Sequence, residues 1–469
     1  MVFSSYVFLF IFLPSLIIVY FLCPVKFRNI ILLLYSLFFY AWNVPAYLVL
    51  LLCSIFINWL AGILIHKYEN ERTNAKIILA STVIINCLFL GYFKYSNFFI
   101  ENINLLLDTN ISLLNVTLPI GISFYTFQGL SYVIDVYRKD GQYQKNPINV
   151  ALYISLFPQL VAGPIVRYDS IAKQLDCRSV SVTKTASGLQ RFIVGLAKKI
   201  ILADTFGIIA DNAFGATNLT SGLAWIGAIS YTLQIFFDFS GYSDMAIGLG
   251  RVFGFDFCEN FNYPYISKSI TEFWRRWHIS LSTWFRDYIY IPLGGNRTTV
   301  KRHICNMLIV WGITGLWHGA SWNFILWGLY YFVWLVLEKY IFPRIPIRVF
   351  GVFQWLYTII AVIIGWVIFR APNLGAAIIY LKAMFGKGIF STESLHDFLR
   401  FLLNYKYFFV FGIIFSTPML KKIYLKFEKK YFDSIVYSIV KYSAFLLLFM
   451  LSCLYVIASS YNAFIYFQF

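Results

Sequence analysis

Long apolar runs, separated by short polar and basic stretches, follow one another along this chain of 469 residues. About eleven of them approach or reach the roughly 20 residues that a helix needs to span a bilayer. The runs are Val2–Val25, Asn29–Trp42, Ala46–Ile65, Ile77–Phe93, Leu189–Ile209, Leu223–Leu249, Ile304–Trp317, Trp322–Leu337, Val352–Phe369, Tyr407–Leu420 and Ile435–Ala458. The pattern predicts an all-α polytopic membrane protein with about eleven transmembrane helices.

Two apolar segments carry helix-breaking residues. Leu118–Phe124 contains Pro119 and Gly121, and Phe157–Pro164 contains two prolines. Such segments are tolerated at membrane depth only where protein buries them or where they line a wet cavity. We therefore expect re-entrant or broken helices here, in addition to the spanning ones.

The composition supports a membrane protein. Hydrophobic residues make up 60% of the chain and charged residues only 13%, against about 25% in an ordinary soluble domain. The net charge of +17 would suggest nucleic acid in a soluble protein. Here the basic residues lie mostly between apolar runs, so we expect contact with anionic lipid headgroups and no nucleic-acid partner.

Seven cysteines are present, and none form a CxxC pair. This spacing argues against a zinc site or a disulfide framework, and we expect buried free thiols and no bound metal.

Two of the five histidines, His278 and His318, lie in aromatic sequence. If residues 271–287 form one helix, polar and apolar stripes run along it, and His278 shares a third face with Trp274. Such a helix suits a membrane interface or a cavity wall. A structural histidine on an interfacial amphipathic helix is the favoured explanation of the pattern; the functional alternative is that an arginine (Arg275, Arg276 or Arg286) meets an anion.

His318 follows a second aromatic pattern, Gly312–Asn323. Gly312, Gly315 and Gly319 share a helical face that would let another helix approach closely. His318 points elsewhere, between Trp317 and Trp322. An ionisable side chain at membrane depth is a functional candidate, and loss of solvation favours the neutral imidazole that can accept a proton. A core histidine hydrogen-bonded to a neighbour is the structural alternative.

Two acidic residues, Asp238 and Asp244, lie in the run from Phe236 to Met245. Buried carboxylates need partners, and an arginine from the 275–286 segment is the expected one. A salt bridge or helix cap explains these residues better than catalysis does.

Together these segments resemble the membrane-bound O-acyltransferase (MBOAT) family. The stretch RRWHISLSTWFRDYIYIPLGGNR resembles the family's first histidine motif, and GLWHGASWN resembles the segment with its essential histidine. DFSGYSDMAIG, NFNYPY, PIGISFYTFQGLSY and PQLVAGPIVRY match as well. The ending IPLGGNR resembles the alginate O-acetyltransferase branch more than the D-alanyl transfer branch.

The resemblance implies one membrane-embedded acyltransferase domain over 1–469, with its core motifs at about 118–330 and a central tunnel. It implies a bacterial inner-membrane enzyme that moves acetyl groups outward to a polysaccharide, with an SGNH-like extracytoplasmic partner. Acetyl-coenzyme A would be the donor substrate, and no bound cofactor is expected. By family analogy His318 is the essential histidine, acting as general base, and His278 is the second one.

Further roles are hypotheses on the same resemblance. His278 would orient the thioester or polarise its carbonyl, and Arg275 or Arg276 would hold the donor's phosphates. Trp317 and Asn323, which flank His318, are predicted to contact substrate. D-alanyl or other acyl transfer, a transporter, and a scaffold that only recruits the partner remain alternative functions.

Overall fold

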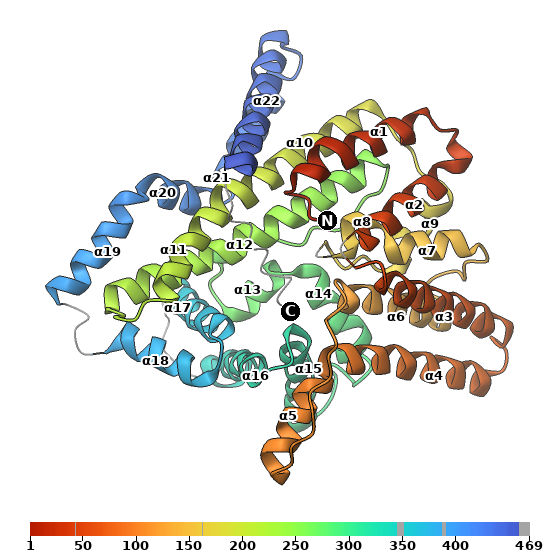
Figure 1. The fold of residues 1–469 in the computed structure, drawn as a ribbon, viewed down its shortest axis with the longest axis horizontal. Helices are drawn as coiled ribbons and strands as arrows, with labels where there is room; N and C mark the ends of the chain where they lie inside the picture. Colours follow the sequence, from red (N-terminus) through yellow and green to blue (C-terminus); the bar gives the residue numbers. More distant parts are fainter. Residues whose placement is uncertain (43, 162, 345–350, 387–390, 459–469) are drawn as a thin grey trace. The chain divides into compact units, whose positions relative to one another are not determined.

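The computed structural model describes residues 1–42, 44–161, 163–344, 351–386 and 391–458. Within these ranges the chain forms helices joined by turns, with no strand (Figure 1). The all-α class is therefore confirmed.

The chain divides into two compact units, Met1–Phe192 with Tyr242–Cys258, and Ile193–Gly241 with Glu259–Phe469. The helices that lie wholly in the first unit are η1 (Phe8–Phe12), α1 (Leu13–Leu22), η2 (Val25–Phe27), α2 (Arg28–Ala41), α3 (Tyr47–Lys67), α4 (Arg72–Leu90), η3 (Gly91–Tyr95), α5 (Ser96–Leu107), α6 (Ile122–Arg138), α7 (Pro147–Ser155), α8 (Phe157–Leu160) and α9 (Tyr168–Asp176).

Two helices, α10 (Val182–Ala197) and α12 (Ser221–Val252), contribute residues to both units. The helices that lie wholly in the second unit are η4 (Lys198–Ala203), α11 (Asp204–Phe214), η5 (Pro264–Ile266), α13 (Ile270–Arg276), α14 (Ile279–Phe285), η6 (Arg286–Tyr290), α15 (Val300–His318), α16 (Trp322–Val336), η7 (Leu337–Ile341), η8 (Phe342–Arg344), α17 (Gly351–Arg370), α18 (Leu374–Phe385), α19 (Thr392–Asn404), α20 (Lys406–Phe415), α21 (Met419–Tyr431) and α22 (Ile435–Ala458). A single domain over 1–469 stays a prediction.

Six helical segments of the described residues are long and apolar enough to cross a membrane, or seven if the bent pair α19 and α20 forms one span. They are Tyr47–Lys67, Arg72–Leu107, Ser221–Val252, Trp322–Arg344, Gly351–Arg370 and Ile435–Ala458. The expected count of eleven is not confirmed. The run Asn29–Trp42 gives α2 with only 14 residues, and the first run gives the shorter apolar helix Phe8–Leu22.

The two broken segments meet inside the first unit. Gly121 has a φ of +74°, and a Cβ built on it would lie 2.6 Å from the carbonyl oxygen of Leu160 in α8. Only glycine fits such a left-handed position at so close an approach. All four residues of α8 are buried, as expected for a broken segment at membrane depth.

The partners of the two aspartates differ from the expected ones. Asp244 pairs with Arg191, at 2.8 Å in the first unit, and in the second unit Asp238 pairs with Lys199 at 3.0 Å. The prediction of an arginine from the 275–286 segment is wrong: Arg276 and Arg286 pair with nearer carboxylates of their own segment, and Arg275 is exposed. The preference for a salt bridge over catalysis fits both pairs.

Lys199 also donates to Asp204, at 2.6 Å, and its side chain is only 2% exposed. Replacing Lys199 by Met should lower the free energy of unfolding by about 3–5 kcal/mol, since it leaves buried carboxylates without this cation. Thermal unfolding of the purified chain in detergent measures the loss. Lys382→Met, at an exposed lysine of α18, is the control. Adding Asp204→Asn and Asp238→Asn should restore much of the stability; an unchanged melting temperature for Lys199→Met alone would contradict the expectation.

The cysteines are mostly not buried within the protein. Only Cys453 is buried, so the prediction of buried thiols is wrong for the other positions. Cys53 and Cys87 are exposed on α3 and α4, two candidate spans that lie side by side in Figure 1. On a spanning helix an exposed apolar side chain meets lipid, which satisfies a thiol as well as a protein core does.

Candidate active site

The segment 271–287 breaks at His278. It folds as α13 and α14, and His278 lies between them with φ 44° and ψ 53°. This left-handed conformation costs a non-glycine residue about 1–2 kcal/mol and persists only where its surroundings hold it. The conditional interpretation of one continuous helix is wrong, because hydrogen bonds to Asn260, 18 positions earlier, outweigh the helical pattern of the sequence.

Asn260 holds His278 in this conformation. Its Oδ1 atom lies 3.1 Å from Nδ1 of His278 and accepts hydrogen bonds from the backbone N–H and the hydroxyl of Ser280, at 3.2 and 2.9 Å. Its carbonyl oxygen also accepts from the backbone N–H of Ile279, at 2.9 Å. One buried asparagine thus connects the histidine to the first turn of α14.

These contacts also set the tautomer of His278. A backbone N–H can only donate, so the bond from Ser280 identifies Oδ1 of Asn260 as the amide oxygen, an acceptor. Nδ1 of the imidazole therefore carries the proton and donates, and Nε2 has the free lone pair. Nε2 is buried and makes no hydrogen bond within the part of the chain that the structure describes.

His278 stays neutral in this environment. The side chain is 1% exposed, and the ring of Phe239 from α12 meets it edge-on at 4.6 Å between centroids. Burial lowers the pKa of His278 to about 3. A neutral imidazole with an available lone pair can accept a hydrogen bond or a proton at ordinary pH.

His318 ends α15 in an aromatic pocket of the same unit. Its ring centroid lies 4.8 Å from Trp317, 4.9 Å from Trp327 of α16 and 5.2 Å from Phe369 of α17. The side chain is 4% exposed. Three separate helices therefore form the surroundings of this imidazole.

The rings of the two histidines both lie near the indole of Trp317. Trp317 contacts His318 and also lies 6.0 Å from the ring of His278. The sequence separates these histidines by 40 positions, and the fold of the second unit brings both to the same tryptophan. Trp317 is itself 4% exposed, so it is a buried spacer between the imidazoles rather than a surface residue.

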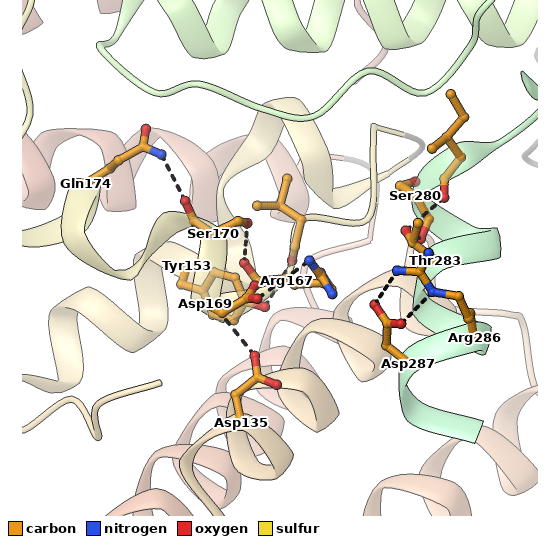
Figure 2. Close-up of polar contacts among 12 residues, drawn as sticks. Asp135, Tyr153, Arg167, Asp169, Ser170, Gln174, Ser280, Thr283, Arg286 and Asp287 are labelled. Atoms are coloured by element: carbon orange, nitrogen blue, oxygen red, sulfur yellow. Dashed lines mark hydrogen bonds and ion pairs between the residues drawn. The ribbon is translucent and has the colours of Figure 1, made fainter. Parts of the chain in front are cut away.

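The predicted anion-binding arginines are mostly engaged within their own segment. Arg276 pairs with Glu272 at 2.9 Å and donates to the carbonyl oxygen of Asn262 at 3.0 Å. Figure 2 shows the guanidinium of Arg286 against the carboxylate of Asp287. The two N–O distances are 2.6 and 3.0 Å. Arg275 is exposed and makes no hydrogen bond or ion pair with any described residue.

Asn323 has a structural contact in this fold. Its Nδ2 donates to the carbonyl oxygen of Ala371 at 2.6 Å, which ties the start of α16 to the end of α17. The glycine face predicted for α15 is partly present. A Cβ on Gly315 would lie 2.3 Å from the carbonyl oxygen of Phe324, whereas Gly312 has open space around it.

Sequence reasoning missed Asn260 and Lys199. Asn260 opens the NFNYPY stretch, and nothing in its spacing indicates a contact with a histidine 18 positions later. Lys199 had a signal, because a lysine inside an apolar run needs an acidic partner and Asp238 lies in another such run. Among the described residues, no three His, Cys, Asp or Glu side chains gather as metal ligands.

Apolar helices long enough to span a membrane, with two buried histidines around one tryptophan, fit a membrane-embedded enzyme. The family model described as MBOAT, membrane-bound O-acyltransferase family, matches residues 142–382. The chain belongs to this family and is an O-acyltransferase, as its motifs predicted.

Named relatives fit the branch suggested by the sequence. The chain is 45% identical over 400 residues to the probable alginate O-acetylase AlgI of Pseudomonas aeruginosa, covering 84% of this chain and 77% of that protein. It is 40% identical to the probable alginate O-acetylase AlgI of Azotobacter vinelandii, with both chains covered in full. The peptidoglycan O-acetyltransferase of Helicobacter pylori is 34% identical over all of this chain and 98% of its own. The alginate O-acetyltransferase-like branch is therefore confirmed.

Proposed function

We propose that this acyltransferase moves an acetyl group from acetyl-coenzyme A in the cytoplasm to a polysaccharide outside the cell membrane. The names of the relatives are the basis for proposing an acetyl group and a polymer acceptor. The observation that carries the proposal is the pair of buried histidines beside Trp317, because an acyl transfer needs a group that moves a proton in a dry site.

In the proposed step His318 is the general base. It takes the proton of an acceptor hydroxyl while the oxygen attacks the thioester carbonyl carbon. The C–O bond forms, the C–S bond breaks, and the proton passes from His318 to the thiolate sulfur, so that atoms and charge balance. The aromatic side chains around His318 exclude water, which would otherwise compete with the acceptor hydroxyl for the acetyl group.

The tautomer of His278 favours one of its two expected roles. Polarising a carbonyl requires a donor, and the Nδ1–H of the neutral ring is already directed to Asn260. Its Nε2 lone pair can instead accept a hydrogen bond from an amide N–H of the thioester arm. We therefore assign His278 to orienting the donor.

Arg275 is the better candidate of the two arginines for the phosphates of the coenzyme. Arg276 is held by Glu272, whereas the exposed guanidinium of Arg275 is available to a bidentate phosphate contact. Trp317 and Asn323 would act mainly as walls of the site, since both side chains are buried.

The proposed setting is the inner membrane of a bacterium, with a polysaccharide acceptor and an SGNH-like extracytoplasmic partner. The chain is a multi-pass membrane protein, and a donor on one side and an acceptor on the other require a passage. The central tunnel belongs to this proposal.

The test uses the purified chain in sealed vesicles, with labelled acetyl-coenzyme A on the side of Arg275 and an unlabelled polysaccharide on the other. We expect label in the polymer, directly or after the SGNH-like partner is added and becomes labelled on a serine. Vesicles containing His318→Ala are the matched control.

Other outcomes of this assay would indicate other functions. Label that accumulates inside as an intact solute indicates a transporter. Transfer only from a D-alanyl thioester indicates that the enzyme is a D-alanyltransferase. No transfer to polymer or partner from any thioester would refute the proposal.

A further inference from the structure

An apolar groove of about 1010 Å³ runs through the second unit, away from the two histidines. Helices α12, α17 and α20 and the stretch that contains η5 form its walls. Its lining is almost wholly hydrocarbon and aromatic, with Ile229, Ile359, Ile363, Phe409 and Ile413 among the side chains. Four hydroxyl-bearing residues also line it, and their hydroxyls already donate to backbone carbonyl oxygens: Thr232, Tyr265, Ser416 and Thr417.

The groove follows α17, a candidate spanning helix, from its first residue. Lining residues of α17 extend from Gly351 to Ile363, about 18 Å at the helical rise of about 1.5 Å per residue. The hydrocarbon core of a bilayer is about 30 Å thick, so one leaflet is about 15 Å deep. The groove therefore has the length of a single leaflet, and it begins where α17 begins.

One end of the groove is cationic. A Cβ built on Gly351 would lie 3.0 Å from Nζ of Lys268, so the ammonium lies against the first turn of α17. Near this end Trp355 donates from Nε1 to the carbonyl oxygen of Tyr265, at 2.9 Å. An aromatic residue with its polar edge satisfied beside a lysine is typical of the membrane interface.

The opposite end is entirely apolar. Ile363 packs there with Ala224 and Ala228 of α12 in a buried cluster. The groove thus has a cation at one end and apolar side chains at the other, so its two ends match the two parts of one phospholipid.

We propose that this groove is a binding site for one membrane phospholipid, with an acyl chain along α17 and the phosphate at Lys268. Apart from Lys268, the lining is almost wholly apolar and its hydroxyls already donate within the protein, so an acyl chain matches it better than a polar ligand does. The bound chain would fill the space between α17 and its neighbours. Because α17 also carries Phe369, which contacts His318, the lipid would brace one wall of the active site.

The test is native mass spectrometry of the full chain purified in mild detergent, combined with analysis of the extracted lipid. We expect one phospholipid to stay with the unaltered chain and to be lost from Ile359→Trp, whose indole fills the groove. Leu447→Trp adds the same bulk at an exposed position of α22 and should keep the lipid.

A second variant tests the headgroup without disturbing the core. Lys268→Gln should weaken retention of anionic lipid about five-fold, as expected for one lysine near a phosphate, while Lys382→Gln on α18 should not. The assay needs no donor or acceptor, so its outcome is independent of the proposed acetyl transfer. No lipid on the unaltered chain, equal lipid on Ile359→Trp, or a dimer of lipid-free chains would each overturn the proposal.

Discussion

Replacing His318 by Ala should lower the rate of acetyl transfer to the polymer by about 10²–10⁴-fold, the usual contribution of a positioned general base. The acceptor hydroxyl would have to lose its proton to water, which the aromatic surroundings exclude. The binding of the donor should change little, because the imidazole acts on the hydroxyl. Initial rates over a range of donor concentrations separate a fall in kcat from a change in KM.

The matched control is His396→Ala. His396 is exposed on α19, so its loss removes an imidazole without touching the site. Both variants should insert into membranes and elute as the unaltered chain does in size-exclusion chromatography. Full acetylation with His318→Ala would remove the catalytic role and favour a scaffold that recruits the partner.

The sequence predicted the two histidines of the candidate site, but not how they are arranged in space. His278 and His318 stand out because histidine is costly in aromatic, apolar sequence unless it is used or hydrogen-bonded. Phe273, Trp277 and Leu281, apolar residues at helical spacing around the first of them, are buried. What a linear pattern does not contain is the distance between the histidines, since Trp317 joins them only in the folded unit.

The hydrophobic pattern of the sequence did not predict the conformation of His278. A period of 3.6 residues continues through the segment, yet the chain breaks there because Asn260, from a different part of the sequence, provides better hydrogen bonds. The partner of Asp238 was missed for a similar reason. Local sequence offers several arginines, but each carboxylate pairs with the cation that packing places beside it, here Lys199.

The number of spans could be predicted only coarsely. Hydropathy measures how apolar a run is, whereas a span also needs unbroken helix of sufficient length. The run Tyr407–Leu420 is mostly apolar, but its helix α20 has 10 residues and meets α19 at 75°. The helix ends at Phe415, three residues before Pro418, and the break at Tyr405 separates it from α19, so neither helix alone reaches the length of a span.

Replacing Asn260 by Asp should move the acidic limb of the pH–rate profile to higher pH. The carboxylate keeps an acceptor oxygen for Ser280 and for Nδ1 of His278, so activity at neutral and alkaline pH should survive. Its negative charge favours the protonated imidazole and raises the pKa of His278 by about 1–3 units from about 3. Activity should therefore fall as the pH drops through about 4–6, where the unaltered enzyme still holds this ring neutral.

Two further variants separate positioning from simple structural support. Asn260→Ala leaves a buried donor of His278 without its acceptor, which costs about 1–3 kcal/mol, and the rate should fall about 5- to 150-fold at every pH. Asn262→Asp adds the same charge two positions away, at an exposed residue that meets Arg276 through its backbone, and should leave the profile unchanged. If Asn260→Asp and Asn262→Asp gave the same profile as the unaltered enzyme, the imidazole of His278 would not be held by Asn260 during catalysis. A shift of the pH–rate profile with Asn260→Asp, but not with Asn262→Asp, would show that the protonation state of His278 controls the rate. A residue that only stabilises the fold would not shift this profile.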